Sequence, residues 1–264
     1  MFIAGCGGGG STTPSSLVHD TTTTIKGSSC NNNVDALGST NFITVHEINE
    51  RVYGCLIVDR SDGFPVLDGL KSARFEVRPW DCSANIGYND CVNDRARHEI
   101  QDASIWSGTT NGQTITYTTN LYIPRQEAFK PRGSSILFLG QIVTNNGPSG
   151  FGTVAFLEVN DNNDLVVRSN VLPQSSNVEK FPLTTNIFDR WIRIQYEIRS
   201  SRTSGYIKIY VDNELKFERS QATLLDDSGA TGIKLGIYNA FKSGAMESFQ
   251  TQIIYYDGLN KTIQ

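Results

Sequence analysis

The stretch IKLGIYNA at residues 233–240 decides how the fold of this 264-residue chain is interpreted. Apolar residues recur at every second position, and Lys234, Gly236 and Tyr238 stand between them. Successive side chains of a β-strand point to opposite faces, so this alternation predicts a strand with one apolar face and one polar face. By itself such a pattern fits an ordinary half-buried strand.

Alternating or apolar runs of the same kind recur along the chain from residue 42 onward, and helix-forming runs are scarce. Strands are expected at residues 42–46, 51–58, 72–78, 95–101, 113–123, 135–143, 153–159, 165–168, 191–199, 205–211, 215–219, 233–240 and 249–256. Turn signals separate them at short spacing, as in the hairpin expected at residues 211–215. We therefore predict an all-β fold, a two-sheet antiparallel β-jelly-roll sandwich of the concanavalin A-like type.

Length and composition fit one domain. The chain has 38% hydrophobic and 19% charged residues, enough apolar material for one large core. The formal net charge of -4 argues against a general nucleic-acid binder, although a local cationic groove can sit on an acidic protein. No stretch approaches the roughly 18 apolar residues of a membrane-spanning helix.

The first residues, MFIAGC, resemble a bacterial lipobox that lacks its basic region and most of its apolar region. In such a motif the cysteine, here Cys6, becomes the lipidated N-terminus. Residues 7–28 are rich in Gly, Ser and Thr and predict a flexible tether. We therefore expect a signal remnant and tether at 1–30, a folded domain at 31–264, and a lipid-anchored or secreted protein of the bacterial cell envelope.

Four cysteines remain if Cys6 carries a lipid, and an even number in an exported protein suggests two disulfides. Of the three possible pairings, we prefer Cys82 with Cys91, which closes a short loop, and Cys30 with Cys55, which ties the N-terminal segment to a strand. Four free buried thiols in a cytosolic protein would be the alternative. The spacings do not match a zinc site.

Polar side chains interrupt three of the expected strands on the face opposite the apolar residues. They are Arg97, Glu99 and Gln101 in one strand, Gln141 in a second, and Lys234 and Tyr238 in a third. A charged strand face is usually just solvated, but a jelly roll has one concave sheet whose side chains line a groove. A groove lined by Arg, Gln, Lys and Tyr suits anions and sugar hydroxyls.

Three motifs that carry these side chains resemble those of jelly-roll polysaccharide lyases: RHEI at 97–100, GQIV at 140–143 and KLGIYN at 234–239. Alginate lyases of that fold have motifs that read R-x-E-L, Q-I-H and Y-x-K-x-G-x-Y-x-Q. The surroundings are more similar to the heparinase I-like and glucuronan lyase group, in SARFEVR (72–78), DRARHEI (94–100), TYTTNLYIP (116–124) and the Trp-led strand followed by GYIKIYV (191–211). The resemblance covers about residues 64–257, with the motifs in the expected order.

The resemblance implies cleavage of a uronic-acid polysaccharide by β-elimination. This reaction removes the C5 proton, neutralises the adjacent carboxylate and protonates the leaving O4. By matching positions, Tyr238 transfers the proton, and Arg97 and Gln141 face the carboxylate.

Further residues are expected to bind substrate or support these three. Lys234 shares the face of Tyr238, where its charge would favour the ionised phenol. Glu99 is expected to orient its arginine neighbour, and Arg78 could hold the acid group of a neighbouring sugar. Asn239, at the end of the third motif, is counted among the substrate-binding residues, and Gly236 is expected to leave a gap for the sugar ring.

The chain departs from the alginate-lyase pattern at two positions, with Val143 in place of His and Ala240 in place of the final Gln. The other histidines do not obviously replace the missing one. His19 lies in the tether, His46 cannot be placed, and His98 has the parity opposite to the polar face and is expected to point away from it.

Either Tyr238 therefore serves as both base and acid, or a residue from another strand helps. One tyrosine on one side of the ring suits syn elimination, in which H5 and O4 lie on the same side. Glucuronate and mannuronate have that relation, whereas guluronate and iduronate do not. The expected substrate is an anionic polysaccharide such as glucuronan, ulvan or the polymannuronate form of alginate.

Two other function classes fit the same fold. A non-catalytic carbohydrate-binding lipoprotein would use exposed aromatic residues, and Trp80, Trp106 and Trp191 are candidates. A glycoside hydrolase would need two acids across the scissile bond, and the Glu-x-Asp-x-x-Glu signature is absent.

No cofactor is expected to be required, and we assign no metal ligand. Related jelly rolls carry a structural Ca²⁺, and the residues 160–164 offer oxygen ligands, although the same run also fits a plain turn. A monomer without nucleic-acid partners is expected, with membrane contact only through the N-terminal lipid.

Overall fold

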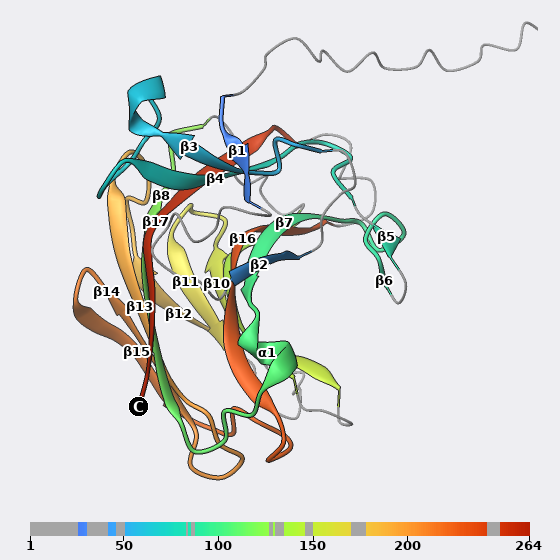
Figure 1. Ribbon diagram of the computed structural model, residues 1–264, viewed down its shortest axis with the longest axis vertical. Helices are drawn as coiled ribbons and strands as arrows, with labels where there is room; N and C mark the ends of the chain where they lie inside the picture. Colours follow the sequence, from blue (N-terminus) through green and yellow to red (C-terminus); the bar gives the residue numbers. More distant parts are fainter. Residues whose placement is uncertain are drawn as a thin grey trace, which may run out of the picture.

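Two antiparallel β-sheets pack face to face in the computed structural model of this protein (Figure 1). The structure describes residues 26–30, 42–45, 51–82, 84–85, 88–126, 129, 135–145, 150–169, 178–241 and 249–264. The expected all-β sandwich is confirmed. Within the described residues, no helix has the length and apolar character needed to cross a membrane.

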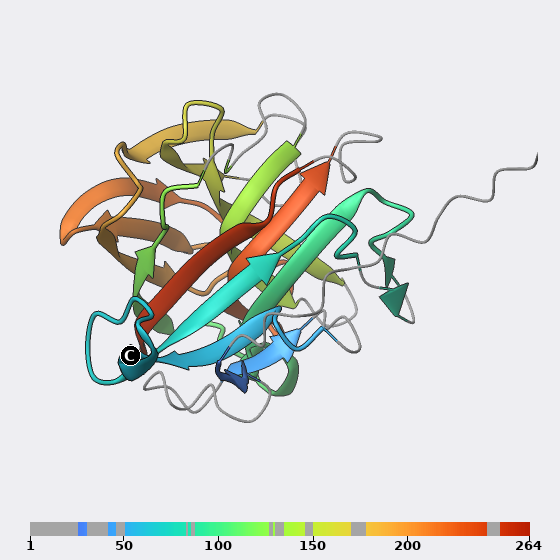
Figure 2. The same cartoon turned by 90° about the horizontal axis from the view of Figure 1, so that it is seen from above.

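The seven-stranded sheet holds the three motif strands side by side. Its order is β12 (Glu179–Thr184), β11 (Leu165–Ser169), β10 (Phe151–Val159), β9 (Ser135–Asn145), β16 (Ala230–Phe241), β7 (Arg95–Asp102) and β2 (Phe42–Val45). Figure 2 shows β16 in orange between β9 and β7. The short helix α1 (Ser104–Ser107) follows β7 directly.

The eight-stranded sheet forms the opposite layer. Its order is β1 (Ser28–Ser29), β3 (Cys55–Asp59), β4 (Lys71–Val77), β17 (Gln252–Ile263), β8 (Thr114–Tyr122), β13 (Trp191–Arg199), β14 (Tyr206–Val211) and β15 (Glu214–Ser220). The 3-10 helix η3 (Arg60–Asp62) follows β3, and β5 (Ala84–Asn85) pairs with β6 (Tyr88–Asn89) in a separate small hairpin.

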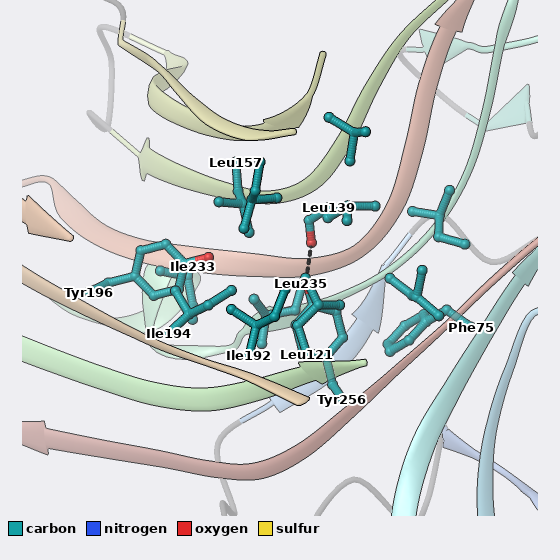
Figure 3. Packing of buried hydrophobic residues seen from close by; sticks show 14 of the residues in the cluster. Phe75, Leu121, Leu139, Leu157, Ile192, Ile194, Tyr196, Ile233, Leu235 and Tyr256 are labelled. Carbon is teal, nitrogen blue, oxygen red and sulfur yellow. Dashed lines mark hydrogen bonds between the residues drawn. The ribbon is translucent and has the colours of Figure 1, made fainter. Parts of the chain in front are cut away.

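One hydrophobic core fills the space between the two sheets (Figure 3). Ile233 and Leu235 of β16 face Ile194 of β13 across this layer, and all three are fully buried. The hydroxyl of Tyr256 in β17 donates a hydrogen bond to the backbone carbonyl of Leu139 in β9, at 2.5 Å. A slip of one residue would expose the apolar set of each strand, so burial fixes which side chains of β16 face outward.

Most expected strands are present, and the differences have local causes. β3 begins at Cys55 because residues 51–54 form a turn, in which the Gly54 N–H donates to the Arg51 carbonyl at 3.1 Å. β12, an edge strand that contains Pro182 and has a mostly exposed pattern, is not among the strands expected from the sequence. Proline and weak alternation are tolerated at an edge but give no strand signal in the sequence. β17 continues to Ile263, seven residues beyond the expected end.

Both preferred disulfides are confirmed, Cys30 with Cys55 and Cys82 with Cys91. The first one joins Cys30 to β3, and Ser28 and Ser29 pair with the same strand as β1. Residues 28–30 therefore contact the folded domain, and the expected domain boundary stays a prediction. Cys6 and the rest of residues 1–25 lie outside the described residues.

Residues 160–164 form a turn that is closed by hydrogen bonds to a side-chain oxygen within the turn. The side-chain carbonyl of Asn160 accepts hydrogen bonds from the backbone N–H groups of Asn162 and Asp164, both at 2.9 Å. Within the part of the chain that the structure describes, no group of three or more His, Cys, Asp and Glu side chains is arranged to hold a metal ion.

Candidate active site

Strand register brings the residues of the three motifs together. Tyr238 of β16 lies opposite Arg97 of β7, and Lys234 lies opposite both Gln141 of β9 and Gln101 of β7. Their neighbours along the strands belong to the core, so these side chains lie on the outer face of the seven-stranded sheet. The sequence motifs therefore converge on one patch of that face.

Tyr238 lies at the centre of this patch and is only 7% exposed. Arg95, the first residue of β7, donates a hydrogen bond from Nη1 to the Tyr238 hydroxyl. The guanidinium carbon of Arg97 lies 4.0 Å from the centroid of the tyrosine ring. On the other side the ring contacts Phe138, with centroids 5.5 Å apart. Two guanidinium groups thus contact one phenol, Arg95 at its hydroxyl and Arg97 over its ring.

Arg97 is held in place by Asp90, a residue of the loop that the Cys82–Cys91 disulfide closes. The Asp90 carboxylate accepts hydrogen bonds from Arg97 Nε at 2.7 Å and Nη2 at 2.6 Å, and both side chains are largely buried. Burial alone would lower the pKa of Arg97, but the hydrogen bonds that it donates to Asp90 and the charge of Glu99 raise that pKa above its ordinary value. Arg97 therefore stays cationic beside Tyr238.

Glu99 links Arg97 to the remaining polar residues. Its Oε1 accepts a hydrogen bond from the Gln141 amide at 2.5 Å, and its Oε2 lies 3.8 Å from Arg97 Nη1. Lys234 is 5% exposed, and burial is the main cause that lowers its pKa from the ordinary value. The charge of Arg97 lowers it further, and the charge of Glu99 opposes the shift. Glu99 thus contacts both Gln141 and Arg97, and the orienting role expected for it stays a prediction.

Gly236 has a different role from the expected gap for a sugar ring. Its φ is +142°, and a Cβ at this position would collide with the backbone carbonyl oxygen of His98 in the neighbouring strand β7. The pairing of β16 with β9 shifts register between Leu235 and Tyr238, so the glycine lies in a β-bulge. A glycine is needed here because the β7 backbone approaches closely.

Two expected substrate-binding residues lie away from this patch. Asn239 is fully buried and donates from Nδ2 to Gln252 of β17, because its parity turns it toward the other sheet. Arg78 follows β4 of the eight-stranded sheet, where it forms an ion pair with Glu76. Its guanidinium carbon lies 3.7 Å from the ring centroid of Tyr53. The full burial of Asn239 contradicts the substrate contact expected for it, whereas the contact expected for Arg78 stays a prediction.

His98 points away from Tyr238, as its parity predicts. Its ring packs against Gly54, and its Nε2 lies 3.6 Å from the Asp81 carboxylate. Val143, at the position of the missing histidine, is fully buried. His19 and His46 lie outside the described residues.

Arg95 and Asp90 are site residues that the sequence analysis did not single out. Arg95 shares the parity of Arg97, so period two places it on the polar face, although no site role was expected for it. It lies opposite Ala240, the small residue that stands where alginate lyases have Gln. Asp90 carries no such signal, because a loop brings it to the sheet.

A family model described as polysaccharide lyase matches residues 60–260, and a search of the curated proteins found no match. Among solved structures, the endo-β-1,4-glucuronan lyase of the fungus Trichoderma reesei is similar with a TM-score of 0.57 and 18% identity, over 83% of this chain and 89% of that chain. The PL-14 alginate lyase of Aplysia kurodai has a TM-score of 0.54 and 12% identity, over 84% and 90% of the two chains. The alginate lyase AlyC3 has a TM-score of 0.52 and 12% identity, over 73% and 75%. The family match spans most of the chain, and the similar structures have the same sandwich fold, so this protein belongs to the polysaccharide lyase family.

Proposed function

We propose that this lyase cleaves a uronic-acid polysaccharide by β-elimination, with Tyr238 transferring the proton. The observation that carries the proposal is the contact of two guanidinium groups with Tyr238, Arg95 at the hydroxyl and Arg97 over the ring. A tyrosine needs such cations to act as a base near neutral pH, because they stabilise the phenolate that forms when its proton leaves.

In the proposed step, the Tyr238 phenolate removes the proton from C5 of the uronate. The C5–H electrons form the C4–C5 double bond, and the C4–O4 bond breaks. The same tyrosine then returns the proton to O4, which leaves as a hydroxyl on the departing chain. One phenol can perform both transfers only if H5 and O4 lie on the same side of the sugar ring.

The uronate carboxylate must be neutralised while the carbanion-like state forms. Gln141 and Arg97, on the strands that flank Tyr238, are the groups proposed for this role. Two of the Arg97 donors already bind Asp90, so we add Arg95, a half-buried arginine on the same face, as a further partner of the carboxylate. The small side chain of Ala240 opposite Arg95 leaves space for this contact.

The syn relation of H5 and O4 favours glucuronate or mannuronate over guluronate or iduronate. The candidate polymers are therefore glucuronan, ulvan and polymannuronate. The similar structures include a glucuronan lyase and an alginate lyase in complex with dimannuronate, and both names agree with this choice.

We also propose that the protein works in the bacterial cell envelope, as a monomer anchored through a lipid on Cys6 or in secreted form. The two disulfides support an oxidising compartment. No cofactor is proposed for the elimination, and a structural Ca²⁺ is compatible with this fold class.

A panel of polymers tests the proposed substrate. The protein is incubated with glucuronan, ulvan, polymannuronate, polyguluronate, hyaluronan and heparin, and the ultraviolet absorbance of the unsaturated uronide is followed. We expect absorbance to rise with at least one polymer whose cleaved residue is glucuronate or mannuronate. Products cleaved only at guluronate or iduronate would contradict the syn mechanism.

A further inference from the structure

Two large exposed aromatic side chains lie against each other, one on the sheet that carries Tyr238 and one on the helix next to it. Trp106 of α1 is 57% exposed and Phe151, the first residue of β10, is 44% exposed. Their rings are stacked, with centroids 5.6 Å apart and planes inclined by 17°. Neither residue belongs to the buried core, so packing within the described core does not account for this exposed pair.

The pair adjoins the candidate active site through Lys234, whose Nζ lies 5.0 Å from the centroid of the Phe151 ring. Phe151 pairs with Asn145 of β9, which pairs with Ala230 at the start of β16. Tyr238 lies four residues beyond Lys234 along that strand, a separation of about 13 Å at the usual rise per residue. The exposed pair thus extends the polar patch along the strand direction.

The helix that carries Trp106 is anchored to the sheet. Ile105 is fully buried over Gly232, where a Cβ would lie 2.6 Å from the isoleucine Cγ1. Asn145 donates from Nδ2 to the Ile105 carbonyl at 3.1 Å. The Asp102 carboxylate, paired with Lys261, accepts hydrogen bonds from Ser104 at the start of the helix. The helix that carries Trp106 is therefore fixed on the sheet. Its backbone loses little additional conformational freedom when the tryptophan binds a ligand.

We propose that Trp106 and Phe151 form a sugar-binding subsite that stacks against a pyranose ring of the polymer, one or more units from the cleaved bond. An aromatic face suits the C–H face of a pyranose ring, and the adjacent Lys234 attracts the uronate carboxylate at the ring edge. The bound polymer would then run along β16 from this subsite to Tyr238. The inference rests on the proposed function, because it assumes a uronate polymer on this face.

Kinetics on a cleaved polymer test the subsite. We expect Trp106→Ala and Phe151→Ala each to raise KM roughly tenfold, as for the loss of one good aromatic contact, with a smaller change in kcat. Trp106→Tyr should recover most of the affinity because it keeps an aromatic face. Leu70→Ala, at a residue that is 68% exposed and precedes β4 of the other sheet, is the control and should behave as the parent enzyme.

A binding measurement separates this inference from the proposed mechanism. Each variant is combined with Tyr238→Phe, and its affinity for glucuronan and polymannuronate oligosaccharides is measured by calorimetry. Weaker binding in the Trp106→Ala combination supports the subsite whether or not Tyr238 is the proton-transfer residue. Unchanged KM and unchanged affinity in both alanine variants would overturn it. A dimer that Trp106→Ala dissociates would also overturn it, because the pair would then be a contact between two copies of the chain.

Discussion

Asp90 and Arg97 form a paired hydrogen-bond contact that fixes the guanidinium beside Tyr238. The two bonds measure 2.6 and 2.7 Å, and the Asp90 side chain is only 2% exposed. Asp90 precedes Cys91, so the disulfide with Cys82 holds the loop that supplies this carboxylate. A loop outside the seven-stranded sheet therefore positions a cation of the candidate active site.

Asp90→Asn should lower both stability and kcat. The substitution removes the closer of the two carboxylates that face the largely buried Arg97 charge and leaves only Glu99 at 3.8 Å, which costs about 3 kcal/mol of unfolding free energy. The guanidinium also loses the contact that holds it over Tyr238. The measurements are denaturant unfolding and the initial rate on the cleaved polymer.

The control for Asp90→Asn is Asp212→Asn, which removes a half-exposed carboxylate paired with Arg190. Exposed ion pairs contribute about 0–1 kcal/mol, so this variant should unfold and react as the parent does. If Asp90→Asn kept the parent rate while folded, the positioning role of Asp90 would be wrong.

Arg95→Ala should reduce kcat by roughly 10²-fold, because a cation that contacts the reacting oxygen is lost. Arg95→Lys should retain part of the rate because the charge remains. Arg95 is half-buried at the start of β7, so the variant is expected to fold. Arg193→Ala, an exposed arginine in the other sheet, is the matched control. Equal rates for the two alanine variants would exclude a role for Arg95.

Gly236→Ala should destabilise the fold by at least ~2 kcal/mol, because positive φ and the β7 backbone both oppose a Cβ. Gly108→Ala is the control, since its φ is -140° and the nearest atom to its Cβ is the Ser104 carbonyl oxygen at 3.6 Å. Thermal unfolding of both variants measures the difference. Similar melting temperatures for the two variants would show that the β7 backbone can move to accommodate the added Cβ without a loss of stability.

Stability should fall as the pH rises from 10 to 12. Burial, the largest cause, and Asp81 raise the pKa of Tyr53 from 10.0 to about 12, and Arg51 opposes them. Between these values the unfolded chain has already lost the phenol proton and the folded chain has not, so the unfolded state is favoured as the pH rises. Unfolding free energies measured across this range should show a smaller slope for Tyr53→Phe. An unchanged slope would contradict the assignment.

The sequence predicts the sandwich and most of its strands because apolar side chains alternate along β16, β4 and β8. The same alternation places Arg97, Lys234 and Tyr238 on the outer face of one sheet. It also turns Asn239 inward, although the resemblance to other lyases had suggested a substrate contact.

Other features depend on contacts that a single strand does not encode. The bulge at Gly236 follows from the approach of β7, and the position of Asp90 follows from a loop closed by a disulfide. Arg78 has the alternation expected for a strand face, but that face belongs to the opposite sheet. The alternation along a strand shows which side chains share one face of that strand. Only the order of strands in each sheet shows which of these faces lie next to one another.

The rate of Tyr238→Phe on a uronate polymer tests the central claim most directly. This substitution removes one oxygen atom and keeps the ring that contacts Arg97 and Phe138. We predict that the variant folds, binds the polymer and produces no unsaturated uronide above background. A variant that forms the unsaturated product at the parent rate would show that another group moves the proton.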